Sequence, residues 1–193
     1  GNNGTMTNMD PATDWVQQAD GSWVLDFDGS DDYVLVAPIA LDDAITVMCR
    51  NQYGGNGGLV TANGYYKNGA WALTAIYSDI RFSNGQSSDG STNANGLLNP
   101  SAGTWYTFGA SYAAPGLPVI WTDGVDDTQA SQAFGTPGYV ADINSIWIGR
   151  GVNAGYSSGQ MGHVAIWQSA LSADEVAIHH LMLSSPATFA TAG

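Results

Sequence analysis

Aspartate side chains crowd two short stretches of the chain in a way that suits a hard divalent cation. Each stretch holds three aspartates within five consecutive residues. Carboxylate oxygens gathered on loops are the ligands that Ca²⁺ takes, and neighbouring carboxylates without a cation repel one another. Aspartate also forms turns through bonds from its side chain to the backbone, so a purely local role stays open. The candidate calcium ligands are Asp28, Asp31, Asp32, Asp123 and Asp126.

Five tyrosines lie in segments rich in glycine and asparagine. An exposed aromatic ring offers a flat face to the CH side of a sugar, and neighbouring amides and carboxylates can bond its hydroxyls. The alternative is that these rings only cover the ends of the fold. The candidate ligand-binding residues are Tyr53, Tyr65, Tyr66, Tyr139 and Tyr156. Other aromatic residues fall within predicted strands and are expected in or beside the core: Trp23, Phe27, Trp105, Phe108, Trp121, Trp147 and Trp167.

The chemistry of the common hydrolases is missing from the sequence. Glycoside hydrolysis needs two facing carboxyl groups, and Glu175 is the only glutamate of the chain. Residues 155–159 match the G-x-S-x-G pattern of serine hydrolases but lie between two predicted strands, whereas that mechanism needs a strand followed by a helix. The three histidines lack the spacing of a zinc site. We therefore predict a protein that is not an enzyme.

Composition limits the class of protein and of partner. The chain has 193 residues, with 4 Lys and Arg against 17 Asp and Glu, which gives a net charge of −13. Such a charge disfavours nucleic acid and anionic lipid. Hydrophobic residues make up 44% and charged residues 11%, which excludes a disordered chain. No apolar run approaches the ~20 residues of a membrane-spanning helix.

Short apolar segments separated by Gly, Asn, Asp and Ser clusters predict many strands and few helices. The predicted strands are residues 23–27, 33–36, 44–50, 57–62, 71–77, 80–83, 104–112, 119–122, 145–149 and 161–167. The long polar stretch 83–101 is predicted as a loop.

One helix has a clear start signal. Ser172 and Glu175 form a capping box, and Leu171 and Val176 are placed for a hydrophobic staple. We expect this helix to end near residue 183, before Pro186.

Six pieces of the sequence, in order, resemble the signatures of laminin-G-like jelly-roll domains of the concanavalin A-like lectin/glucanase superfamily, of the kind found in phage structural and secreted bacterial proteins. The pieces are 25–34 (LDFDGSDDYV), 45–48 (ITVM), 103–106 (GTWY) with 110–112 (ASY), 121–125 (WTDGV), 146–149 (IWIG), and 161–167 with 170–176 (ALSADEV). The resemblance implies an all-β, antiparallel two-sheet jelly-roll sandwich with one short C-terminal helix. It assigns residues 1–183 to the domain and 184–193 to a C-terminal tail or linker.

The sequence departs from this family in two places. Gly162 and His163 stand where the family's last strand commonly carries acidic residues, so no role of those acids carries over. The family's first strand, which precedes a turn like residues 1–5, is absent from the chain. An unpaired sheet edge attracts another strand. We expect the tail 184–193, the stretch 6–9 or a neighbouring copy to fill the gap, with an intermolecular contact favoured.

These observations predict a non-catalytic glycan-binding or adhesion module displayed outside the cell or on a virus particle. Its expected partners are a glycan or cell-surface polysaccharide and neighbouring particle subunits, and its one expected cofactor is Ca²⁺. The alternative is a purely structural decoration or assembly domain of a phage or other extracellular particle, with no sugar ligand.

Overall fold

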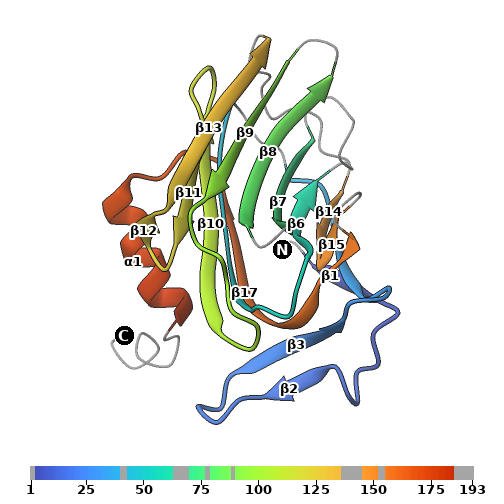
Figure 1. The fold of residues 1–193 in the computed structure, drawn as a ribbon. Helices are drawn as coiled ribbons and strands as arrows, with labels where there is room; N and C mark the ends of the chain where they lie inside the picture. Colours follow the sequence, from blue (N-terminus) through green and yellow to red (C-terminus); the bar gives the residue numbers. More distant parts are fainter. Residues whose placement is uncertain are drawn as a thin grey trace.

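Alternating apolar residues place one side of most strands against a shared core. A computed structural model describes residues 3–39, 43–62, 70–76, 79–87, 90–135, 145–151 and 155–184. Two antiparallel sheets face each other, and one helix lies on the outside of the smaller sheet (Figure 1). The predicted all-β sandwich with a C-terminal helix is therefore confirmed.

The larger sheet has eight strands. Their order is β1 (Gly4–Thr7), β4 (Tyr33–Val36), β14 (Ile146–Ile148), β6 (Gly57–Ala62), β7 (Trp71–Ile76), β8 (Asp79–Ser87), β9 (Gly90–Gly96) and β13 (Thr128–Gly135). The smaller sheet has seven. Their order is β12 (Val125–Asp126), β11 (Val119–Thr122), β10 (Trp105–Ala113), β5 (Ala44–Gln52), β17 (Ser158–Trp167), β3 (Trp23–Asp28) and β2 (Trp15–Gln17). A short separate hairpin joins β15 (Arg150–Gly151) to β16 (Gly155–Tyr156).

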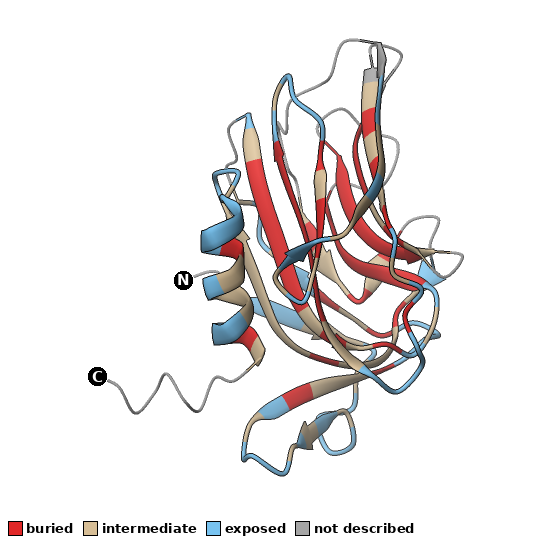
Figure 2. Cartoon of the chain, turned by 60° about the vertical axis from the view of Figure 1, so that its left-hand side comes forward, coloured by how far each residue is buried: buried red, intermediate tan, exposed pale blue. Residues whose placement is uncertain are grey.

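The core lies between the sheets, where the buried segments of Figure 2 are concentrated. Strand β5 shows the pattern: Ile45, Val47 and Cys49 are fully buried and face the core, as strand alternation requires. Met48, on the opposite side of β5, packs instead in a second cluster under the helix with Val176.

The helix α1 (Ala173–Ser184) starts where the capping box predicts. The Ser172 backbone N–H donates to Oε2 of Glu175 at 2.8 Å, and the Glu175 backbone N–H donates to the Ser172 hydroxyl at 3.4 Å. Leu171 packs against the cluster that contains Val176, as expected for a staple. No helix in the described part of the chain has the length and apolar character needed to span a membrane.

The polar stretch 83–101 differs from the prediction of a loop, because most of it forms strands. Strands β8 and β9 pair through it, with Ser83 opposite Asn93 and Asn84 opposite Thr92. Ser83, Asn84 and Thr92 are all buried in the sheet. Strands β8 and β9 bury polar side chains here. The alternation of apolar residues that predicts a strand is therefore absent from this stretch.

The N-terminal stretch adds a strand to the larger sheet. Strand β1 pairs with β4, and Met6 of that stretch lies opposite Val34 and packs against the core. The stretch 6–9 was one of three candidates expected to fill a sheet edge, and its first residues do pair within the chain. Residues 185–193 lie outside the described residues, and a contact between copies stays a prediction.

Candidate functional site

An arginine stands among three aromatic rings on the outer face of the larger sheet. The Cζ atom of Arg150 lies 4.5 Å from the ring centroid of Trp147, 4.9 Å from that of Tyr33 and 5.7 Å from that of Tyr156. A guanidinium within about 6 Å of a ring face is attracted by it. The rings of Tyr33 and Tyr156 are themselves 6.5 Å apart. We call these four half-buried side chains the arginine–aromatic patch.

Strand alternation explains why two of these rings face outward. Val34 and Ile148 belong to the core between the sheets or pack against it. Tyr33 and Trp147 precede them by one residue, so their side chains point to the opposite face. The pairing of β4 with β14 brings the two strands side by side.

The other two members of the patch come from the β15–β16 hairpin, where Arg150 lies opposite Tyr156. The hairpin is fixed to β6 by the Thr61 hydroxyl, which donates to the Arg150 carbonyl oxygen at 2.7 Å. Gly58 permits this close approach, because a Cβ atom there would overlap the backbone of Arg150 and Gly151.

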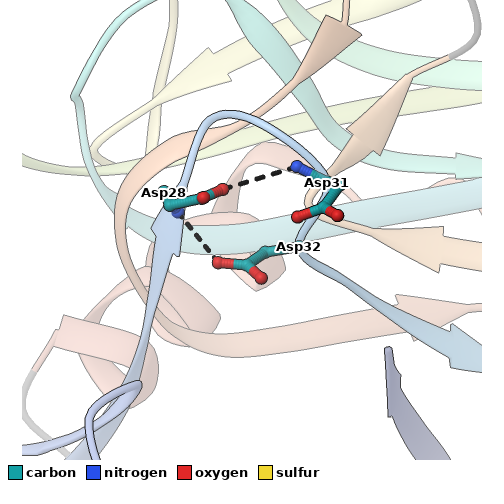
Figure 3. A group of neighbouring side chains, drawn as sticks. All are labelled: Asp28, Asp31 and Asp32. Atoms are coloured by element: carbon teal, nitrogen blue, oxygen red, sulfur yellow. Dashed lines mark hydrogen bonds between the residues drawn. The ribbon is translucent and has the colours of Figure 1, made fainter. Parts of the chain in front are cut away.

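The aspartate turn between β3 and β4 leads directly into Tyr33. One carboxylate oxygen from each of Asp28, Asp31 and Asp32 lies within 4.8 Å of the others (Figure 3). Asp28 Oδ1 accepts backbone N–H bonds from Ser30 at 2.7 Å and from Asp31 at 3.4 Å. Asp32 Oδ2 accepts the Asp28 backbone N–H at 3.0 Å. We call Asp28, Asp31 and Asp32 the acidic turn.

The acidic turn holds charge in unequal surroundings. Asp28 and Asp31 are exposed, whereas Asp32 is only 4% exposed. The hydrogen bond from the Ser30 backbone lowers the pKa of Asp28. Burial raises the pKa of Asp32, and the negative charge of Asp28 adds to this effect. A cation would offset the cost of burying the Asp32 charge and the repulsion between the carboxylates. Three carboxylate oxygens would supply part of the 6–8 oxygen ligands that Ca²⁺ takes.

The two other predicted calcium ligands serve a separate turn. Asp123 Oδ1 accepts the backbone N–H of Thr107 at 2.8 Å. Asp126 Oδ1 accepts the backbone N–H of Thr128 at 2.9 Å. Within the described ranges, the acidic turn is the only group of three such side chains that could hold a metal ion, and a calcium role for Asp123 and Asp126 stays a prediction.

The predicted ligand-binding tyrosines fall in different places. Tyr156 lies in the arginine–aromatic patch. Tyr53 differs from the exposed ring that was expected, since it is 7% exposed and packs in the core, where burial raises its pKa. Tyr65, Tyr66 and Tyr139 lie outside the described residues.

Three members of the patch were missed as site residues. Trp147 was expected in or beside the core, and Tyr33 and Arg150 were not singled out. Two features of the sequence could have indicated them. Tyr33 and Trp147 each stand next to an aliphatic residue that faces the core, so alternation along the strand turns their rings outward, and arginine is scarce in the chain.

The G-x-S-x-G segment places its serine in a buried link between two strands. Ser157, its central serine, is 1% exposed and lies between β16 and β17, as predicted for a turn between strands. Its backbone N–H donates to the Gly149 carbonyl oxygen at 2.8 Å.

Sequence comparison finds no matching family model and no matching curated protein. Solved structures do match. Domain 4 of AbnA, a GH43 extracellular arabinanase from Geobacillus stearothermophilus, solved in complex with arabinotriose, has a TM-score of 0.67 and 16% identity over 91% of this chain and 86% of that one. The binding domain of Paraclostridial Mosquitocidal Protein 1 has a TM-score of 0.70 and 12% identity over 93% of this chain and 47% of that one. The native heptameric SAP-like pentraxin of Limulus polyphemus has a TM-score of 0.57 and 13% identity over 79% and 78% of the two chains.

The chain has the concanavalin A-like lectin/glucanase jelly-roll fold. This confirms the fold that the six sequence pieces implied. Identities this low establish the fold alone. The jelly-roll chain spans about half the length of the mosquitocidal binding domain, at 47% of it.

Proposed function

We propose that this jelly-roll domain binds glycans without catalysis, through the arginine–aromatic patch. The observation that carries the proposal is the grouping of Tyr33, Trp147 and Tyr156 around Arg150 on one sheet face. Tyrosine and tryptophan rings offer flat apolar faces to a sugar, and a guanidinium donates hydrogen bonds to sugar oxygens. Because Arg150 packs against all three rings, the patch is held in place before a ligand arrives, which lowers the entropy cost of binding.

The carboxylates of the chain support binding rather than hydrolysis. Glu175 is committed to the helix cap, where its Oε2 accepts bonds from the Ser172 backbone and hydroxyl. The acidic turn brings three carboxylates together, but they sit in one turn and bond its backbone. They do not face each other across a groove, as the acid and the base or nucleophile of a glycosidase do. We expect the purified chain to release no reducing sugar from β-glucans or chitin.

Structural neighbours are consistent with this role outside the cell. One was solved as a domain of an extracellular arabinanase in complex with arabinotriose. Another is from botulinum neurotoxin type C, whose cell entry is dependent upon interaction with two ganglioside molecules; its TM-score is 0.64, with 10% identity over 94% of this chain and 46% of that one. By analogy of fold, we place this domain outside the cell or on a particle surface.

Calcium at the acidic turn is part of the same proposal. The turn ends at Asp32, and the next residue is Tyr33 of the patch. An ion held by the three carboxylates would therefore stabilise the chain at the point where it enters the patch. Its remaining ligands would be water or ligand hydroxyls.

A glycan array followed by titration calorimetry tests the function. Trp147→Ala and Tyr156→Ala should each weaken binding by about 1–3 kcal/mol, the scale of a lost aromatic anchor. Trp105→Ala is the matched control, because Trp105 also lies under an arginine, Arg50 at 4.8 Å, but belongs to the other sheet. Binding that survives both site changes would reject the patch, and an array without any signal would reject the function.

The alternative, a structural assembly domain, is favoured by one edge strand. Strand β13, with the sequence TQASQAFG, is the last strand of the larger sheet, and β9 is its one partner among the described strands. It carries no lysine, proline or charged residue, the features that normally protect a sheet edge. Sedimentation velocity over a range of concentrations tests this alternative, which a concentration-independent monomer would contradict.

A further inference from the structure

The guanidinium of Arg150 pairs with no acceptor among the residues that the structure describes. A guanidinium carries five N–H donors. In the part of the chain that the structure describes, none of them reaches a carboxylate or another acceptor; the one hydrogen bond of Arg150 to a side chain uses its carbonyl oxygen. Arg150 is half-buried, and its nitrogens are not among the buried polar atoms that lack a partner.

The other two arginines of the described residues are engaged differently. Arg81 donates from Nε to Oδ1 of Asn95 at 2.9 Å. Arg50 lies over one ring, that of Trp105, and its charge acts on His163. Among the described arginines, Arg150 is the one that lies over three rings.

Partial burial of a cation costs free energy where no anion replaces the lost hydration, and no described carboxylate pairs with the half-buried Arg150. A planar carboxylate matches the guanidinium fork with two parallel hydrogen bonds, which are stronger than bonds to neutral oxygens. The neighbouring rings would receive the apolar face of the same ligand.

We propose that the arginine–aromatic patch recognises an acidic sugar, with the carboxylate on Arg150 and the sugar ring against the aromatic side chains. The proposal rests on the proposed function and adds the ligand class. A uronate and a sialate both present this carboxylate beside a pyranose ring.

Two pairs of glycans measure how much the carboxylate contributes to binding. Trigalacturonate is compared with its methyl ester, and 3′-sialyllactose with lactose, by titration calorimetry on the full chain. At least one acidic probe should bind about 10–100-fold more tightly than its neutral counterpart, the range expected for hydrogen bonds to a charged group. The pair that shows the preference identifies the source of the carboxylate.

Variants of Arg150 test the residue. Arg150→Met keeps much of the apolar stem and should abolish the preference for the acidic probe. Arg150→Lys keeps the charge without the fork and should reduce the preference, and it serves if the first variant fails to fold by circular dichroism. Arg50→Met is the matched control and should leave the preference unchanged.

The outcomes distinguish the two proposals. Equal binding of acidic and neutral probes overturns the acidic ligand and leaves glycan binding standing. A preference that survives in both folded Arg150 variants overturns the assignment to this residue. Absence of binding to every glycan, acidic or neutral, overturns the function itself.

Discussion

Replacing Gly58 with alanine tests whether the close packing of β6 against the β15–β16 hairpin holds the candidate site together. A Cβ atom at this position would overlap the backbone of Arg150 and Gly151, and backbone cannot rotate away as a flexible side chain does. The two segments must therefore separate, which strains the 2.7 Å hydrogen bond from the Thr61 hydroxyl to the Arg150 carbonyl oxygen. Overpacking costs about 1–3 kcal/mol, and the backbone clash places Gly58→Ala near the upper end.

The assay is urea denaturation followed by tryptophan fluorescence, with a thermal melt beside it. A loss of about 3 kcal/mol corresponds to a fall in Tm of roughly 6–12 °C for a domain of this size. Gly162→Ala is the control, because its Cβ would meet only Val24 Cγ1 at 3.5 Å and the Arg50 carbonyl oxygen at 4.0 Å. That change should be neutral or stabilise by up to about 1 kcal/mol through the unfolded chain. Equal stability of the two variants would refute the packing argument.

Three further changes probe the acidic turn, the helix cap and a half-buried histidine. Calcium should raise the Tm relative to EDTA, and the rise should disappear in Asp32→Asn but persist in Asp126→Asn; identical melts would leave the acidic turn as a turn former. Ser172→Ala should cost about 1 kcal/mol in urea denaturation because it removes the N-cap hydroxyl, and an unchanged midpoint would count against the cap. Burial and the charge of Arg50 lower the pKa of His163 below its usual 6.5, so the unfolded chain binds this proton more readily. Stability should therefore fall as the pH drops from about 7.5 to about 5.5, and less steeply in His163→Gln; equal slopes would contradict this.

Local patterns in the sequence were sufficient for much of the fold. Strands β4, β6 and β11 have the predicted bounds, because each is a short, mainly apolar segment with turn residues on both sides. The helix cap was also predictable, since the Ser172 and Glu175 side chains bond within four residues of chain. The grouping of Asp28, Asp31 and Asp32 follows from their place in a single turn.

The tertiary structure alone decided which side chains are buried when polarity and burial disagree. Thr92 is polar yet buried in β9, whereas Trp23 is apolar yet 53% exposed, contrary to the prediction for it. Trp23 lies on the β2–β3 hairpin, which forms one edge of the smaller sheet at the bottom of Figure 1. Whether a side chain is buried depends on which distant segment packs against it, and the neighbouring residues in the sequence do not specify that segment.

The arginine–aromatic patch depends on long-range strand pairing for the same reason. Alternation along β4 and β14 predicts which face Tyr33 and Trp147 occupy, but their proximity requires that these two distant strands pair. The placement of Arg150 requires further that β6 carry a glycine where the β15 backbone crosses it. The sequence by itself thus determined the strands, the turn and the helix cap through short-range periodicity and hydrogen bonding. The tertiary structure decided the site, because only the packing of distant segments brings its rings and its charge together.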